Sequence, residues 1–155
     1  MPNGRVLLYT AKGRLYKVGD IVPPLADELS KPLKMKMLIV DDSAAMRRCI
    51  KDLLPVAAEK LECSDGHAAV LAFAVHHPDW VLMDIDMKPL DGLSAARQIR
   101  ADWPDARIIF VTSHDRPRFR EAASQLKADG YVLKDNLEQI NQIVAATAAR
   151  AKTSL

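Results

Sequence analysis

The chain has 155 residues, of which 49% are hydrophobic and 27% are charged, and its formal net charge is +2. This length suits one domain with a full core and excludes two ordinary domains, and the composition is that of a soluble globular protein. No apolar run approaches the roughly 20 residues that span a membrane, and no signal peptide is recognisable. Cys49 and Cys63 are too few for a disulfide framework, so we expect a cytoplasmic protein with free thiols.

Residues 1–36 differ in character from the rest of the chain. They hold seven Lys/Arg against three Asp/Glu, whereas residues 37–155 hold fifteen against seventeen, which does not indicate a nucleic-acid binder. Apolar stretches at 6–10 and 14–18 flank a Gly-containing turn and predict a short β-hairpin, with a linker after it. We interpret residues 1–36 as an N-terminal extension. Three alternatives stay open: a hairpin docked on the domain or on a second copy, a flexible tail, or sequence upstream of the functional start.

From residue 37 onward, apolar strands alternate with helices. The first two units contain a strand at 37–40, a helix capped by Ser43, a strand at 60–63 and an alanine-rich helix at 67–77. Three further units follow, with strands at 79–84, 107–111 and 131–133 and helices at 92–103, at 116–127 and after residue 137. Five such units predict an α/β domain with a doubly wound, five-stranded parallel sheet covered by helices on both faces.

Polar side chains follow four of the apolar strands. Asp41 and Asp42 follow the first strand, Asp84 the third, Thr112 the fourth and Lys134 the fifth. Because parallel strands end at the same edge of a sheet, we expect these side chains to converge. Clustered carboxylates repel one another unless a cation holds them, and Mg²⁺ accepts carboxylates together with phosphate and water. Thr112 and Lys134 would then contact the oxygens of a phosphoryl group.

Position along the sheet edge also suggests a role for each acid. Asp84 would accept a phosphoryl group as an acyl phosphate. Asp42, supported by Asp41, would hold the metal, and the backbone carbonyl of Asp86 is a candidate third ligand. The sequence therefore predicts a magnesium-dependent phosphoacceptor.

These motifs resemble the receiver domain of two-component response regulators. The matching segments are Val40-Asp41-Asp42-Ser43, Leu82-Met83-Asp84 with Met87 and Asp91-Gly92, Val111-Thr112-Ser113, and Gly130-Tyr131-Val132-Leu133-Lys134. The resemblance covers residues 37–152, with 153–155 as a tail. It implies a flavodoxin-like (β/α)5 fold with strand order 2-1-3-4-5.

The resemblance also implies a bacterial signalling role. Asp84 would be the phosphoacceptor for a histidine kinase or histidine phosphotransfer protein, and the acidic pair after the first strand would bind Mg²⁺. Thr112 and Lys134 would sense the phosphoryl group, with Tyr131 as the switch aromatic. Such a receiver is not an enzyme beyond its own phosphorylation and slow dephosphorylation. It would bind a downstream protein through its fourth helix, fifth strand and fifth helix. Homodimerisation stays open, and no DNA-binding domain is recognisable in the 155 residues.

Two positions depart from the common receiver pattern. Lys88 stands where many receivers have proline, and Pro89 follows it. Asp135 follows Lys134, where many receivers have a proline that often takes a cis bond, so we expect a trans bond here.

Several charged residues lie near the predicted site. Asp86 and His114, two residues beyond the acceptor and the threonine, flank the expected path of attacking water, which suggests that they tune the lifetime of the acyl phosphate. Arg116, Arg118 and Arg120 begin the weakly apolar fourth helix, where they are either part of the partner surface or a solvated face.

Two other functions fit part of the pattern. A haloacid-dehalogenase-like phosphohydrolase also uses an Asp-x-Asp strand end, such as Asp84 with Asp86, then a threonine and a lysine. That family places further metal-binding acids after the lysine, whereas the acidic pair here precedes Asp84. A receiver-like interaction module that is never phosphorylated is the second alternative.

Overall fold

The computed structural model describes residues 7–9, 15–17 and 34–153. The chain divides into two units, Met1–Leu33 and Lys34–Leu155. In the first unit β1 (Leu7–Tyr9) pairs antiparallel with β2 (Leu15–Lys17), at the positions of the expected hairpin. The expected linker and residues 154–155 lie outside the described residues. The division into an extension, a domain at 37–152 and a tail stays a prediction.

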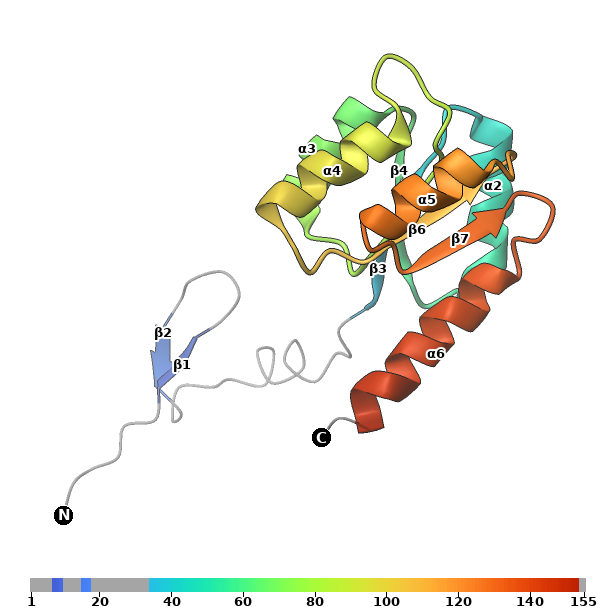
Figure 1. Ribbon diagram of the computed structural model, residues 1–155. Coiled ribbons are helices and arrows are strands. Elements are labelled where there is room, and N and C mark those ends of the chain that lie inside the picture. The colour runs from blue at the N-terminus through green and yellow to red at the C-terminus, as the bar shows by residue number, and fades with distance from the viewer. Residues whose placement is uncertain (1–6, 10–14, 18–33, 154–155) are drawn as a thin grey trace. The chain divides into compact units, whose positions relative to one another are not determined.

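The second unit alternates strands and helices along its whole length (Figure 1). The strands are β3 (Lys36–Val40), β4 (Glu59–Cys63), β5 (Trp80–Met83), β6 (Ile108–Thr112) and β7 (Gly130–Leu133). The helices are α2 (Ala44–Leu53), α3 (Gly66–His76), α4 (Gly92–Asp102), α5 (Pro117–Gln125) and α6 (Gln139–Thr153). None of the helices in the described part of the chain combines the length and apolarity that a membrane span requires.

The five strands form one parallel sheet in the order β4-β3-β5-β6-β7. This is the order 2-1-3-4-5 counted from β3, so the predicted fold is confirmed. The chain leaves β3 toward β4 on one side and returns to β5 on the other. The carboxyl ends of β3 and β5 therefore flank the topological switch point, where open α/β sheets bind ligands.

Helices cover both faces of the sheet, with α3, α4 and α5 on one face and α2 and α6 on the other (Figure 1). Side chains alternate between the two faces along each strand. In β3, for example, Leu38 and Val40 enter the first core, whereas Met37 and Ile39 enter the second. All four are essentially buried, which explains why the strand reads as a continuous apolar run.

The starts of three helices are fixed by side-chain caps. Ser43, Asp65 and Asp91 each accept a hydrogen bond from the backbone N–H three residues onward, at 3.3, 2.9 and 2.9 Å. By contrast, the N-cap of α5 is Arg116, whose side chain makes no cap hydrogen bond, and the buried residue of this helix is Ala123. Of these four helices, α5 is the one that begins without a side-chain cap.

Candidate functional site

An acidic cluster occupies the carboxyl ends of β3 and β5. Carboxylate oxygens of Asp41, Asp42 and Asp84 all lie within 4.8 Å of one another. Asp41 and Asp84 are buried, with 0% and 4% exposure, whereas Asp42 is exposed. The backbone N–H of Asp84 donates to the carbonyl of Val40 at 2.9 Å, which continues the pairing of β3 with β5 by one residue and aligns the acids.

The ammonium of Lys134 forms ion pairs with two of these carboxylates. Its Nζ lies 2.7 Å from Oδ2 of Asp41 and 3.2 Å from Oδ2 of Asp84, and the lysine side chain is 14% exposed. Since Lys134 follows β7, at the end of the sheet, its long side chain reaches back across β6 to the acids. The fold thus brings Lys134 together with the three acids, Asp41, Asp42 and Asp84, as the sequence predicted.

The donor set fits a divalent, oxygen-seeking cation. Oδ1 of Asp41 accepts the N–H of Ser43 at 2.8 Å, and Oδ2 lies 2.7 Å from the ammonium of Lys134. One ammonium faces three carboxylates here, so the cluster keeps an excess of negative charge that a divalent cation would offset. Mg²⁺ matches a site of a few carboxylates that is open to water on the side of Asp42.

Burial and neighbouring charges shift the pKa values of Asp84 and Lys134, which form the central ion pair. Burial raises the pKa of the Asp84 carboxyl to about 6, the Lys134 ammonium acts to lower it, and the Asp41 carboxylate acts to raise it. Burial alone would lower the pKa of Lys134, but the two carboxylates outweigh it, so the pKa of Lys134 is raised. Asp84 is therefore a more basic carboxylate than usual, facing a cation that stays charged.

Thr112 is the last residue of β6 and is fully buried. Its Oγ1 accepts the backbone N–H of His114 at 3.2 Å, and its carbonyl accepts the N–H of Lys134 at 2.9 Å. The second bond joins the ends of β6 and β7, and the first ties the hydroxyl to the loop that follows β6. Within the described residues, the hydroxyl makes no hydrogen bond to the acidic cluster.

The carboxylate of Asp86 stands apart from the acidic cluster. It is 54% exposed and lies 2.8 Å from Nε2 of His114. The backbone carbonyl of Asp86, which is the atom predicted to bind metal, accepts no hydrogen bond in the described part of the chain. The contact with His114 joins the loop after β5 to the loop after β6 beside the site.

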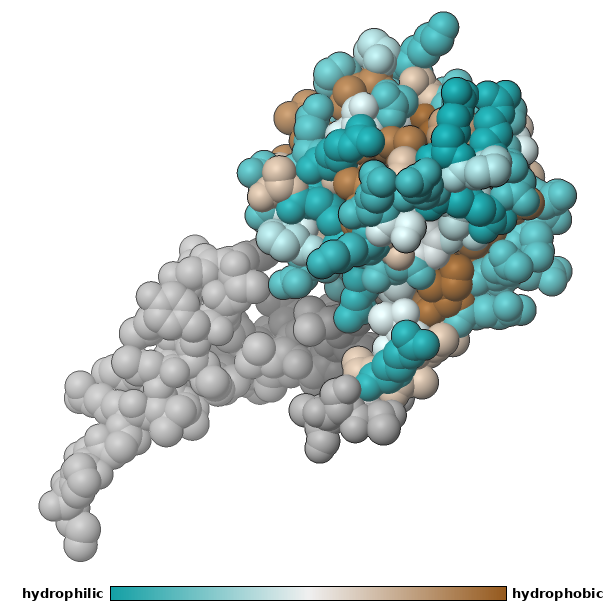
Figure 2. Space-filling model, in the orientation of Figure 1, coloured by the Kyte–Doolittle hydropathy of each residue, from teal (hydrophilic) through white to brown (hydrophobic). Residues whose placement is uncertain are grey.

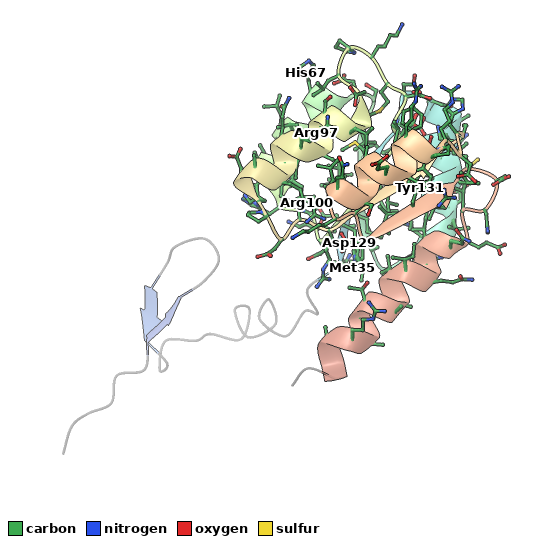
Figure 3. The ribbon with its side chains drawn as sticks, in the orientation of Figure 1. Met35, His67, Arg97, Arg100, Asp129 and Tyr131 are labelled. Carbon is green, nitrogen blue, oxygen red and sulfur yellow. The ribbon has the colours of Figure 1, made fainter. Side chains whose placement is uncertain are left out.

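Tyr131 projects from β7 beside α5 (Figure 3). Its hydroxyl donates to the backbone carbonyl of His114 at 2.7 Å, and the guanidinium of Arg120 lies 4.6 Å from the ring centroid. Arg120 is also ion-paired with Asp115. Burial raises the pKa of the Tyr131 hydroxyl, which stays a donor. The expected switch residue is thus tied to the loop that follows Thr112.

Two features of the site were missed by sequence reasoning. Arg47, on the first turn of α2, donates from Nη1 to the carbonyl of Asp41 at 2.7 Å and forms an ion pair with Glu62 at 3.2 Å. It therefore holds the backbone of Asp41 in place. Its position four residues after the helix cap was the available signal. The second feature is a close backbone approach at Gly92, a residue already in the matched motif, where an added Cβ would lie 1.8 Å from the carbonyl oxygen of Asp84.

The loop after β5 contains a cis peptide bond between Lys88 and Pro89, and no other cis bond occurs among the described residues. The bond between Lys134 and Asp135 is trans, as expected.

A cavity of about 450 Å³ lies at the opposite edge of the sheet, before β5 and β6. Its lining includes Phe73, Trp103 and Asp105 and none of the residues of the acidic cluster. The acidic cluster is therefore formed by the carboxyl ends of the strands and lies outside this cavity.

Comparison with known proteins now defines the class. The family described as response regulator receiver domain matches residues 37–147, and the chain belongs to that family. Receiver domains are signalling proteins of two-component systems, which bind Mg²⁺ at an acidic pocket and interact with histidine kinases and downstream effectors. The predicted family is confirmed, in preference to a haloacid-dehalogenase-like hydrolase.

Two curated relatives illustrate the similarity. The nitrate/nitrite response regulator protein homolog of Haemophilus influenzae is 36% identical over 121 residues, which cover 71% of this chain and 57% of that protein. The chemotaxis protein CheY of Bacillus subtilis is 36% identical over 101 residues, which cover 64% of this chain and 84% of that protein. The chain spans about half the length of several relatives, for example 44% of the transcriptional regulatory protein DegU of Brevibacillus brevis.

Solved structures agree on the fold. The CheY-like receiver domain protein of Methanospirillum hungatei JF-1 superposes with a TM-score of 0.71 at 18% identity, covering 79% of this chain and 99% of that one. A two-component response regulator of the LuxR family from Aurantimonas sp. SI85-9A1 gives a TM-score of 0.68 at 28% identity, covering 75% and 86%.

Proposed function

We propose that Asp84 is the phosphoacceptor of a two-component phosphorelay, which receives its phosphoryl group from a histidine kinase or a histidine phosphotransfer protein. One observation carries the proposal: a buried carboxylate with a raised pKa lies beside an ammonium and two further carboxylates at the switch point of the sheet. The family and the relatives named as response regulators support the same reaction.

The chemistry follows from the atoms present. A carboxylate oxygen of Asp84 attacks the phosphorus of the phosphohistidine, a P–O bond forms, and the P–N bond breaks. The imidazole of the donor leaves as the neutral group, with a proton taken from solvent onto its free nitrogen. Asp84 enters the reaction as the carboxylate, which predominates above its pKa of about 6.

Asp41, Asp42 and Asp84, with the backbone carbonyl of Asp86, would hold Mg²⁺. When bound, the metal supplies positive charge for the phosphoryl oxygens. The remaining charge is met by Lys134, whose ammonium already lies 3.2 Å from Asp84 and needs only a small movement to pair with a phosphoryl oxygen.

The acyl phosphate would act as a switch through Thr112 and Tyr131. The Thr112 hydroxyl now accepts a hydrogen bond from the loop backbone and is available to donate its proton to a phosphoryl oxygen. If Thr112 and its loop shift, the carbonyl that holds the Tyr131 hydroxyl shifts with them. The surface of α5, β7 and α6 would then change and bind a downstream protein. We place this signalling in the cytoplasm, and homodimerisation is a further outcome of the same surface.

Phosphorylation by a small phosphodonor with Mg²⁺, read by intact mass, tests the proposal. The expected result is the mass of one added phosphoryl group on the wild type and on Asp102→Asn, a distant exposed acid, and none on Asp84→Asn. Unmodified wild type would instead favour a receiver fold that acts only as an interaction module. Multiple turnover of a small phosphomonoester would favour a hydrolase.

A further inference from the structure

Two arginines lie against one aromatic ring at the start of α5. The guanidinium carbons of Arg116 and Arg118 are 5.8 and 4.9 Å from the ring centroid of Phe119. Both arginines are exposed and Phe119 is half-buried. An aromatic ring attracts a cation that lies within about 6 Å of its centroid, and this attraction restricts the arginine side chain. We call Arg116, Arg118 and Phe119 the arginine–phenylalanine cluster.

The two guanidinium groups of the cluster have no carboxylate partner in the described part of the chain. Other arginines near the site are neutralised: Arg47 pairs with Glu62, and Arg120 pairs with Asp115. A guanidinium beside an aromatic ring finds no lone-pair acceptor there, so its N–H groups stay available to an incoming ligand. Those N–H groups suit bidentate hydrogen bonds to a carboxylate.

The surroundings of the cluster reinforce its positive charge. Residues 116–121 contain three arginines and one glutamate. The positive end of the α5 dipole lies at the same place, and the N-cap side chain does not neutralise it. The face over α5 is mainly hydrophilic (Figure 2). This local charge contrasts with residues 37–155 as a whole, which hold more acidic than basic side chains and would repel a long polyanion.

Direct contacts connect the cluster to the candidate phosphoacceptor site. The ring of Phe119 lies 6.4 Å from the ring of His114, at an interplanar angle of 49°. His114 contacts Asp86 through Nε2 and accepts the hydroxyl of Tyr131 at its carbonyl. A rearrangement of either loop therefore moves a side chain against which the arginines are placed.

We propose that the arginine–phenylalanine cluster is the docking surface for an acidic segment of a partner protein, with an affinity that changes when the acidic cluster is phosphorylated. The choice of an acidic partner rests on charge complementarity, and the dependence on phosphorylation rests on the proposed function. Carboxylates of the partner bind the edges of Arg116 and Arg118, and an apolar side chain of the partner covers the open part of the Phe119 ring.

Fluorescence anisotropy with the full chain tests this surface. The probes are a fluorescein-labelled acidic peptide with several glutamates, the same peptide with each glutamate replaced by glutamine, and duplex DNA of matched charge. We expect the glutamate peptide to bind and the other two to bind at least tenfold more weakly, because the glutamine peptide offers no charged acceptor and the net acidic domain repels duplex DNA.

Matched variants separate the cluster from general charge. Arg116→Gln with Arg118→Gln should weaken peptide binding about tenfold or more. Arg97→Gln with Arg107→Gln removes the same charge from α4 and from the loop before β6 and should leave binding within about twofold of wild type. Phe119→Leu keeps an apolar side chain without the ring and should give an intermediate loss.

Binding by the wild type and the variants tests the docking surface and its dependence on phosphorylation separately. Equal binding by wild type and the Arg116/Arg118 double variant, an equal loss in the Arg97/Arg107 variant, or tighter binding of DNA would overturn the docking surface. The measurement is then repeated after treatment with a small phosphodonor, with intact mass as the check. An unchanged affinity of chain shown to be phosphorylated overturns the dependence on phosphorylation. Absence of added mass instead contradicts the proposed function, while the variants still decide the docking surface.

Discussion

Gly92 lies directly against the backbone of Asp84. A Cβ added at residue 92 would be 1.8 Å from the carbonyl oxygen of Asp84 and 2.9 Å from the side chain of Met83. The backbone N–H of Gly92 also donates to the carbonyl of Ile85 at 2.9 Å. The first turn of α4 is therefore packed on the chain segment that presents the acidic side chain.

Gly92→Ala should displace that segment, because the clashing atoms are backbone and cannot rotate away. We expect a loss of about 1–3 kcal/mol in the free energy of unfolding, measured by urea denaturation, and slower phosphorylation. Gly130→Ala is the control, because its added Cβ would meet the flexible end of the Ile143 side chain at 2.6 Å. A smaller loss at residue 92 than at residue 130 would contradict this account.

Lys134→Met should destabilise the protein at neutral pH. The change leaves Asp41 and Asp84 buried together without the ammonium that lies 2.7 and 3.2 Å from them. We expect a loss on the order of 2 kcal/mol in the free energy of unfolding at pH 7 without divalent metal, and a smaller loss at pH 5. Urea denaturation at both pH values is the measurement. A loss that is the same at both would mean that charge is not its cause.

The raised pKa of Asp84 makes stability depend on pH. The folded value is about 6 against an ordinary value of 3.8, so between these two values the folded protein binds more protons than the unfolded chain. The free energy of unfolding therefore falls as pH rises through this window, by up to about 3 kcal/mol from this group. Asp84→Asn should be more stable than wild type at pH 7 without metal, and the difference should shrink toward pH 4. A constant difference would show that Asp84 has an ordinary pKa.

Mg²⁺ should stabilise the folded protein through the acidic cluster. At ten times the dissociation constant the gain in the free energy of unfolding is about 1.4 kcal/mol, seen as a rise in Tm. Asp42→Asn removes an exposed candidate ligand without disturbing the core and should abolish most of the rise. A control with Na⁺ at equal ionic strength isolates the specific effect, and an equal rise in the variant would exclude Asp42 as a ligand.

The contact between His114 and Asp86 should set the lifetime of the acyl phosphate. Their side chains lie 2.8 Å apart beside the site, where they restrict the approach of water. His114→Ala and Asp86→Ala should each change the decay rate of the phosphorylated protein several-fold, and the double variant should add little to either single change. Decay is followed by intact mass over time. Unchanged decay in both single variants would remove this role.

The sequence by itself determined the layered fold and the membership of the acidic cluster. Continuous apolar strands such as 37–40 can be buried only between two layers of helices, and parallel strands must end at one edge. Once that is known, Asp41, Asp84 and Lys134 converge whatever the details of the loops. Strand ends are rigid, so order along the chain translates directly into position in space.

Only the tertiary structure decided how the loops meet. Three contacts join residues from separate loops and helices: Asp86 pairs with His114, Arg120 lies over the ring of Tyr131, and Gly92 packs against the backbone of Asp84. No periodicity in the sequence encodes such contacts, because they depend on side-chain rotamers and on the packing of one loop against another. Distances of a few ångströms between independent segments are fixed when the whole domain is assembled.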